Sequence, residues 1–245
     1  MALPKVETPT YELTLPSQDL QVKYRPFLVR EEKILMMANE AGEKKDITHT
    51  TMEVLQSCTF NQIDVQNLPL FDIEYLFLNI RAKSVGEKAK FKILCKDDMK
   101  TYADVEIDLT KIDVQVDDNH TNNILLNEET KLGVVFTYPT YANLKKKIDF
   151  EKMDVKTTFN MISECIDHIY EGEKIYPSKE TTEKERMNFL ESLNGEQFDK
   201  LKAFFETMPT LKHEVEIENP ETKVKNKVVF RGLSDFFMSA SPTTR

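Results

Sequence analysis

Residues 70–80, with the sequence LFDIEYLFLNI, constrain the fold more than any other segment. Apolar side chains recur at the spacing of one helix face and also fill most of the remaining faces. Two narrow polar lines are all that the pattern leaves for water. A helix that is apolar nearly all round is a buried helix, so this segment is predicted to be the core of its domain. The apolar positions are Leu70, Phe71, Ile73, Tyr75, Leu76, Phe77, Leu78 and Ile80, and the polar lines are Asp72 with Asn79 and Glu74 with Arg81.

The pattern around this helix predicts an N-terminal α+β domain over residues 1–138, in which packing helices and β-hairpins cover a buried central helix. Alternating apolar residues indicate the strands, and apolar spacings of three and four indicate the helices. Its expected elements are a hairpin at 11–25, helices at 28–41 and 46–58, a second hairpin at 87–109 and extended segments at 112–116 and 131–138. The apolar stripe of the first of these helices consists of Ile34, Leu35, Ala38 and Ala41.

A second domain is predicted over residues 139–245, beginning with a helical segment and ending with a β-hairpin and a short terminal helix. Asn194 and Gly195 separate two of its helices, because this pair is a strong turn signal. Its expected helices are 157–170, 180–193 and 196–208, followed by strands at 211–218 and 223–231 and the terminal helix at 232–238.

The charge balance argues against a general affinity for nucleic acid. The 245 residues carry 33 Lys and Arg against 42 Asp and Glu, which gives a formal net charge of −9 and a pI of about 5.1. Such a charge repels nucleic acid unless a basic patch overrides it. The longest basic run, residues 145–147, is short and is followed at once by acidic residues, so no nucleic-acid partner is expected.

Cysteine usage and hydropathy indicate the compartment. Cys58, Cys95 and Cys165 are odd in number, far apart and in no paired spacing, which indicates a reducing environment without a disulfide framework. The N-terminus lacks the apolar run of a signal peptide, and no stretch approaches the roughly 20 apolar residues of a membrane span. We therefore expect a soluble cytosolic protein.

The turn Ser84-Val85-Gly86 superficially resembles a phosphate site, with two basic residues, Arg81 and Lys83, close by. A phosphate cradle needs a glycine-rich turn from a strand into a helix, whereas here a helix precedes a strand. Cations near a helix C-terminus and a glycine after it are instead typical of a helix cap. We predict a capping role for this turn.

Two further patterns resemble metal sites. Residues 117–128 place oxygen ligands at the spacing of a calcium loop, but Asn122 occupies its glycine position and a strand precedes it, so a polar surface loop is expected. Glu164 and His168, four residues apart on the predicted helix, supply only two ligands where zinc needs three or four. The other histidines are scattered, so no catalytic, cofactor-binding or metal-binding residue is predicted.

Three blocks of sequence carry a family resemblance: KYRPFLVREEKILMMA at 23–38, LFDIEYLFLNIRAKSVGE at 70–87 and FRGLSDFF at 230–237. Together they resemble the baseplate hub assembly proteins of T-even-like contractile-tailed bacteriophages. The blocks extend over nearly the whole chain, and the middle one is the most specific. The motif positions of the family then fall on Tyr24, Arg25, Pro26, Phe27, Glu31, Glu32, Phe71, Asp72, Tyr75, Arg81, Ser84, Gly86, Glu87, Gly232, Phe236 and Phe237.

The resemblance implies a non-enzymatic protein of phage tail morphogenesis. It would act as an assembly factor or chaperone of the baseplate hub, through contacts with other hub proteins or the tape-measure protein. The alternative is a stoichiometric structural subunit of the hub in the virion. The resemblance implies that an assembly factor is located in the host cytoplasm and that a structural subunit is located in the tail baseplate of the virion. It implies no cofactor. The state of self-association stays open.

Candidate partner-binding residues lie in the first and last blocks. Two adjacent aromatic side chains on a short terminal helix point in different directions, so one of them is a candidate anchor for a partner. The alternative is that both rings pack in the core of the second domain. Some relatives carry cysteine pairs in two hairpins, but here Cys95 is alone, so no metal-stabilised hairpin is expected. The candidate residues are Tyr24, Arg25, Phe27, Phe236, Phe237 and Met238.

Overall fold

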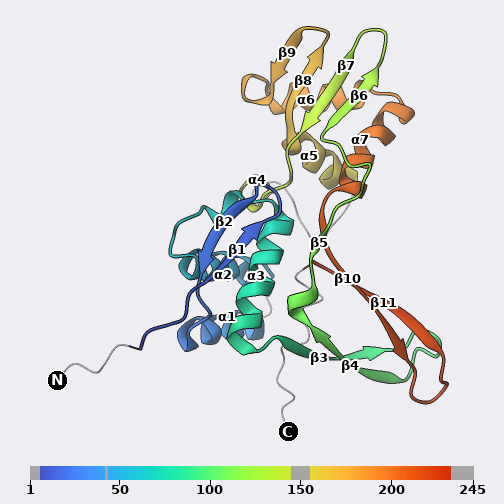
Figure 1. The fold of residues 1–245 in the computed structure, drawn as a ribbon. Coiled ribbons are helices and arrows are strands. Elements are labelled where there is room, and N and C mark those ends of the chain that lie inside the picture. Colours follow the sequence, from blue (N-terminus) through green and yellow to red (C-terminus); the bar gives the residue numbers. More distant parts are fainter. Residues whose placement is uncertain (1–5, 42–43, 145–154, 233–245) are drawn as a thin grey trace. The chain divides into compact units, whose positions relative to one another are not determined.

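A computed structural model of the chain describes residues 6–41, 44–144 and 155–232 (Figure 1). The chain forms two compact units, of which unit 2 comprises Gln66–Leu70 and Val116–Pro209. Unit 1 comprises the residues before and after these ranges in the sequence: Met1–Val65, Phe71–Gln115 and Thr210–Arg245. This division differs from the two consecutive domains, 1–138 and 139–245, that the sequence predicts. The C-terminal hairpin returns to unit 1, where Leu211 pairs with Val114.

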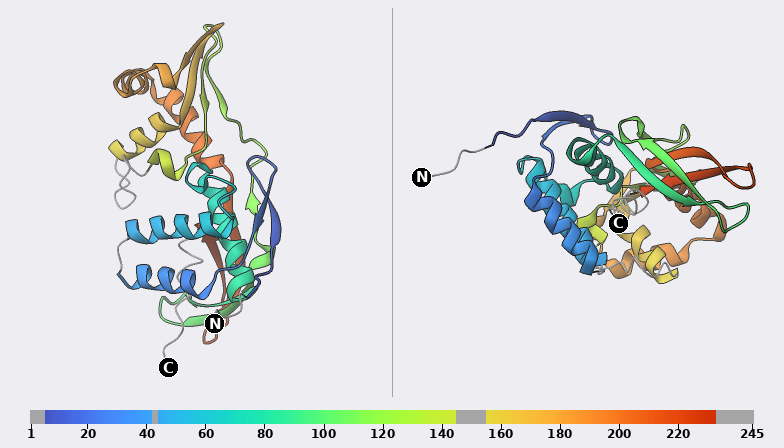
Figure 2. Two further views of the ribbon diagram at one scale, coloured as in Figure 1. Left: turned by 90° about the vertical axis from the view of Figure 1, so that its left-hand side faces the viewer. Right: turned by 90° about the horizontal axis from the view of Figure 1, so that it is seen from below.

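In its described residues, unit 1 combines helices α1, α2 and α3 with small antiparallel sheets, which confirms the α+β class; the predicted terminal helix at 232–238 lies almost entirely outside them. The sheets have the orders β1–β2, β3–β4 and β11–β10–β5. Helices α1 and α2 pack side by side (Figure 2). The elements are β1 (Tyr11–Leu15), β2 (Leu20–Tyr24), α1 (Val29–Ala41), α2 (Lys44–Cys58), α3 (Leu70–Val85), β3 (Lys88–Leu94), β4 (Tyr102–Asp108), β5 (Val114–Gln115), β10 (Thr210–Glu218) and β11 (Lys225–Arg231).

Helix α3 is the buried central helix that the sequence predicts. Leu76, Leu78 and Ile80 are completely buried, and Phe77 is 2% exposed. On one side, Leu78 packs in a cluster with residues of β3, β4, β10 and β11. Within that cluster, the rings of Phe91 and Phe230 meet edge to face with centroids 4.8 Å apart, so α3 and both hairpins share one core.

The polar lines of α3 face water only in part, because Glu74 and Asn79 are half-buried and their line partners are buried. Asp72 is completely buried and Arg81 is 7% exposed. Asp72 accepts hydrogen bonds from the Ser17 backbone N–H, at 3.2 Å, and from the Ser17 hydroxyl. Burial raises the pKa of Asp72, and these hydrogen bonds from Ser17 lower it in part. The turn between β1 and β2 thus covers a face of the helix that the sequence alone leaves open.

A polar clasp around Asp97 joins the tips of the β3–β4 and β10–β11 hairpins. The side-chain oxygen of Asn226 accepts from the backbone amides of Lys96, at 2.9 Å, and Asp97, at 3.1 Å. The side-chain amide of Asn226 donates to the Asp97 carboxylate at 2.8 Å, and that of Asn219 donates to both carboxylate oxygens at 3.1 Å. Both asparagines are buried, so side-chain amides connect the two hairpins in which no cysteine pair occurs.

Unit 2 is a four-stranded antiparallel sheet in the order β6–β7–β8–β9, with helices on one of its faces (Figure 2). Its core combines residues of the strands with residues of α5, α6 and α7, including Phe136, Ile162 and Phe204. The predicted break between two helices lies at Asn194, whose side chain also caps α7 by accepting from the Gln197 backbone amide. The elements are β6 (Asn123–Asn127), β7 (Leu132–Phe136), α4 (Tyr141–Leu144), α5 (Val155–Cys165), β8 (Ile166–Glu171), β9 (Lys174–Pro177), α6 (Glu183–Ser192) and α7 (Gly195–Thr207).

The predicted helix at 157–170 is wrong in its second half. Helix α5 ends at Cys165, and the chain continues directly as β8, which forms a hairpin with β9. Gly172, with φ of +60°, makes the turn. The β-branched and aromatic residues on either side of this glycine favour strands, and this local signal competes with the helical spacing before it.

We predict that Phe77→Ala lowers the free energy of unfolding by about 3–5 kcal/mol, because it leaves a cavity in the core around α3. The measurement is chemical denaturation of the purified protein. Val85→Ala on the same helix is the control, since Val85 is 62% exposed and its truncation should cost less than about 0.5 kcal/mol. Equal effects of the two substitutions would contradict the burial of α3.

Candidate functional site

The first sequence block forms a buried ion pair. Arg25 follows β2, and its guanidinium binds the Glu31 carboxylate of α1 with both arms of its fork, at 2.7 and 2.8 Å. The same guanidinium donates to Ser57 Oγ of α2 at 2.9 Å. Arg25 and Glu31 are 7% and 4% exposed, so this pair fixes β2, α1 and α2 to one another inside unit 1.

Glu31 is also the capping residue of its own helix. The backbone N–H of Leu28 donates to its carboxylate at 2.7 Å, and the Ser57 hydroxyl donates at 3.2 Å. Burial alone would raise the pKa of Glu31, but the hydrogen bonds from Arg25, Leu28 and Ser57 lower it to about 2. The carboxylate is therefore charged at neutral pH, and both of its oxygens accept hydrogen bonds from within unit 1.

The turn after α3 lies within the hydrogen-bond network of unit 1. Helix α3 ends at Val85, and Gly86 follows with φ of +136°. The Ser84 hydroxyl accepts from the Phe27 backbone N–H at 2.7 Å and donates to the carbonyl of Ile80 at 2.6 Å. The turn therefore holds the segment after β2 against α3 by hydrogen bonds.

The partner-binding candidates of the first block are placed mostly inside unit 1. Tyr24 and Arg25 are 3% and 7% exposed, so they offer little surface to a partner. Phe27 is half-buried, and its ring lies 5.8 Å from that of Phe77. The remaining candidates, Phe236, Phe237 and Met238, lie outside the described residues.

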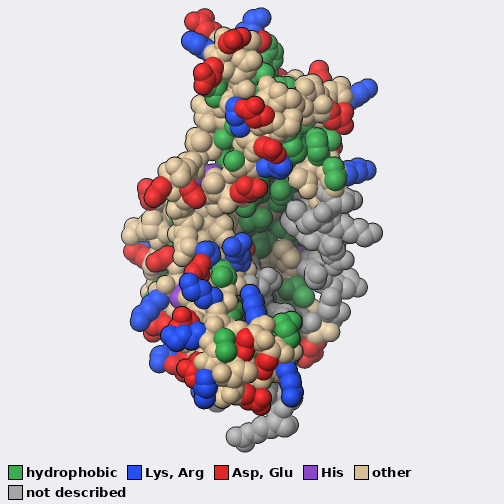
Figure 3. All heavy atoms as spheres, turned by 90° about the vertical axis from the view of Figure 1, so that its right-hand side faces the viewer, with side chains coloured by type: hydrophobic (Ala, Val, Ile, Leu, Met, Phe, Trp, Pro, Cys, Tyr) green, Lys and Arg blue, Asp and Glu red, His purple; other side chains and the backbone are tan. Residues whose placement is uncertain are grey.

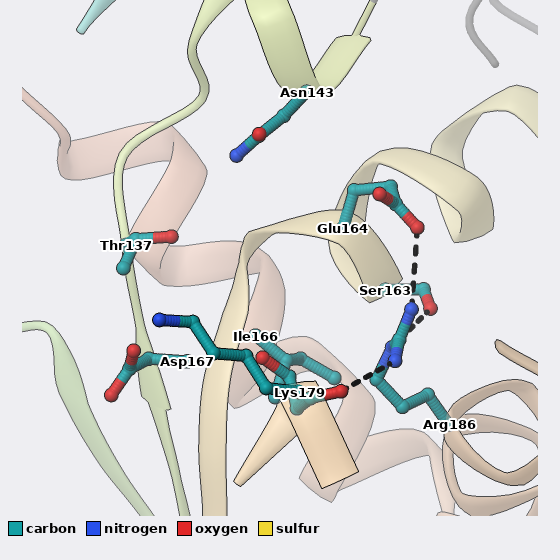
Figure 4. Close-up of a pocket in the computed structure, with 9 residues that line it drawn as sticks. Thr137, Asn143, Ser163, Glu164, Ile166, Asp167, Lys179 and Arg186 are labelled. Atoms are coloured by element: carbon teal, nitrogen blue, oxygen red, sulfur yellow. Dashed lines mark hydrogen bonds and ion pairs between the residues drawn. The ribbon is translucent and has the colours of Figure 1, made fainter. Parts of the chain in front are cut away.

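A pocket of about 410 Å³ in unit 2 is built around Arg186 of α6 (Figure 4). The Arg186 guanidinium donates to the backbone carbonyls of Ser178 and Thr181, at 3.1 and 2.9 Å, and to Glu164 at 3.4 Å. The guanidinium thereby connects α5, α6 and the turn after β9. The lining residues, which include no histidine or cysteine, are Thr137, Asn143, Ser163, Glu164, Ile166, Asp167, Ser178, Lys179 and Arg186.

The patterns that resemble metal sites do not assemble into one. Asn123–Asn127 of the calcium-like segment is strand β6, so these residues do not form the surface loop expected there. His168 lies on strand β8 rather than on the helix of Glu164, and its Nδ1 contacts Asp167 at 2.7 Å. Within the described residues, no group of three or more His, Cys, Asp or Glu side chains is placed to hold a metal ion.

All three cysteines are buried free thiols. Burial raises the pKa of Cys58 and of Cys165 to about 12 and also raises the pKa of Cys95. A thiol is nucleophilic only as the thiolate. These cysteines therefore behave as small core residues at neutral pH.

Helix α1 presents an apolar surface, which we call the α1 face. Val29, Met36 and Met37 are 83%, 47% and 58% exposed and lie on the side opposite Glu31. Ile34, part of the apolar stripe of this helix, is 49% exposed. Exposed apolar side chains on one helix face are typical of protein contact surfaces, where methionine adapts to irregular partners.

Charges elsewhere are mixed rather than segregated. On the face shown in Figure 3, Lys and Arg side chains are interspersed with Asp and Glu. Ion pairs cross the hairpins, such as Lys88 with Glu106 at 2.8 Å and Lys225 with Glu216 at 2.6 Å. In the described part of the chain, no helix combines the length and apolarity needed to cross a membrane.

Comparison with known families decides the class of the protein. The family model of the T4 bacteriophage base plate protein matches residues 8–238, nearly the whole chain. The chain belongs to this family. The three sequence blocks therefore indicate the correct class, a phage baseplate protein. No curated protein and no solved structure matches this baseplate protein.

Proposed function

We propose that this baseplate protein is a non-enzymatic assembly factor of the baseplate hub that acts through contacts with other hub proteins or the tape-measure protein. The family match over residues 8–238 carries the proposal, because it makes other baseplate proteins the natural partners. The placement of the block residues supports it. Arg25, Glu31 and Ser84 are used to join β2, α1, α2 and α3, as in a scaffold for protein contacts.

The amount of the protein in finished particles tests this proposal. Quantitative mass spectrometry of purified virions should find it absent or far below the amounts of the permanent baseplate proteins, while the infected-cell lysate contains it. A fixed whole-number ratio to those proteins in virions would contradict the assembly-factor role. It would favour the second candidate, a stoichiometric subunit of the hub, which the same family match supports.

We further propose that the α1 face contacts the partner. Arg30, Lys33 and Glu40 are exposed among its apolar residues, so the face suits a partner surface that has apolar side chains and charges of both signs. Because Met37 is exposed, Met37→Glu should change the free energy of unfolding by less than about 0.5 kcal/mol. It should nevertheless reduce the yield of infectious phage when it replaces the natural protein.

The matched control for this prediction is Met99→Glu. Met99 is an exposed methionine on the loop between β3 and β4, so the control adds the same charge at a different surface. Both variants are compared by thermal melting and by complementation of a phage that lacks the gene. Equal yields from both variants would contradict a role of the α1 face.

The buried ion pair also predicts a dependence of stability on pH. The folded-state pKa of Glu31 is about 2, below the value of about 4.3 in an unfolded chain. Its contribution to stability is therefore complete above about pH 5 and is lost as the pH falls toward about 2. Glu31→Gln should remove a stability increment on the order of 2–3 kcal/mol from the pH profile.

Denaturation curves between about pH 2 and pH 7 measure this effect. Glu32→Gln is the control, because Glu32 is the exposed neighbour on the same helix turn. The control should keep the wild-type slope of stability against pH. If Glu31→Gln also keeps it, the Glu31 carboxylate is not the group whose protonation weakens unit 1.

A further inference from the structure

Two arginines of unit 1 are equally buried but differ in their partners. Arg25 and Arg81 are each 7% exposed. The Arg25 guanidinium binds Glu31 with both arms and donates to Ser57 and to the carbonyl of Pro26. The Arg81 guanidinium makes no hydrogen bond or ion pair with any residue that the structure describes.

An unpaired guanidinium in a protein interior is unfavourable, because it loses hydration without gaining a counter-charge. Burial lowers the pKa of Arg81, and no acidic side chain in the described ranges offsets this. No described side-chain nitrogen or oxygen is fully enclosed without a hydrogen-bond partner. The unpaired nitrogens of Arg81 therefore keep some contact with solvent.

The backbone that carries Arg81 is held firmly. One helix turn before it, Phe77 is 2% exposed in the core. On the following turn, the Ser84 hydroxyl accepts the Phe27 backbone N–H. A charged group on such a fixed helix loses little conformational freedom when a ligand binds, so its position favours recognition.

We propose that Arg81 is a docking site for a carboxylate group, an Asp or Glu side chain of the protein that binds this chain during baseplate assembly. The inference rests on the proposed function, which supplies the protein partner. A guanidinium presents a planar fork of N–H donors that matches both oxygens of a carboxylate. Docking pairs a charge that has no partner among the described residues, so the bound state gains an interaction that these residues do not supply.

The test compares Arg81→Met with Arg25→Met in the full chain. Methionine replaces the unbranched aliphatic stem of arginine with one of similar shape and removes the charge. The two positions have the same exposed fraction. Arg81→Met should leave the melting temperature unchanged or raise it, because it removes an unpaired buried charge. Arg25→Met should lower the melting temperature by roughly 10 °C or more, since it strands the Glu31 carboxylate.

The second readout is complementation of a phage that lacks the gene. Arg81→Met should reduce the yield of infectious particles by about tenfold or more, although the protein is at least as stable as the wild type. A lower melting temperature for Arg81→Met would overturn the inference, because it would show that the chain itself pairs Arg81. An unchanged yield would overturn it as well.

These outcomes are distinct from a failure of the proposed function. If deletion of the whole gene leaves baseplate assembly and infectivity intact, the proposed function fails. If deletion blocks assembly while Arg81→Met supports it fully, only the role of Arg81 is refuted.

Discussion

The burial of the apolar side chains in the central part of α3 is the constraint on which the rest of unit 1 depends. A helix that is apolar on nearly every face needs cover on every face. Ser17 in the β1–β2 turn and Phe27 after β2 each cover part of α3. The β3–β4 and β10–β11 hairpins add further cover, with Phe230 in the shared core. The polar groups on α3 must then find partners inside the unit, and among the residues that the structure describes Asp72 has one and Arg81 has none. This contrast makes Arg81 the exceptional residue of the helix.

The buried polar contacts of unit 1 fix geometry more than they add stability. Replacing a buried ion pair with apolar residues is often neutral or stabilising, whereas removing one partner is costly. The Arg25–Glu31 pair and the Asp97–Asn226 clasp each connect elements far apart in sequence. Such contacts suit a protein whose surfaces must be presented in a defined arrangement to other baseplate proteins.

Local pattern was enough to predict α3, α2, the break between helices at Asn194 and most hairpins, because each depends on periodicity or on one turn residue. It was not enough for β8, where strand-forming residues follow a helical repeat without a break. The outward orientation of Ile34 also escaped prediction, because α1 packs on α2 with the side that carries Glu31. The pairing of Glu31 with Arg25 becomes evident only in the three-dimensional structure.

Baseplate membership was predictable from the three blocks, but the roles of their residues were not. From the sequence alone, Tyr24 and Arg25 could be surface or interior residues. The structure places the Glu31 carboxylate beside the Arg25 guanidinium and thereby explains the burial of this arginine. The division into compact units differs from the predicted domains for a similar reason, since the pairing of Leu211 with Val114 is a contact between residues remote in sequence. Periodicity carries no information about such long-range pairs.

The interrupted path of unit 1 has a consequence for synthesis of the chain on the ribosome. Protein domains usually complete in order from the N-terminus. Here the contiguous main part of unit 2, Val116–Pro209, is translated before the strands that complete unit 1. Until β11 emerges, Phe91 lacks the ring of Phe230 that covers it, and the core beside α3 stays exposed. The central portion of the chain can therefore mature first, while the N-terminal portion waits for the last strand.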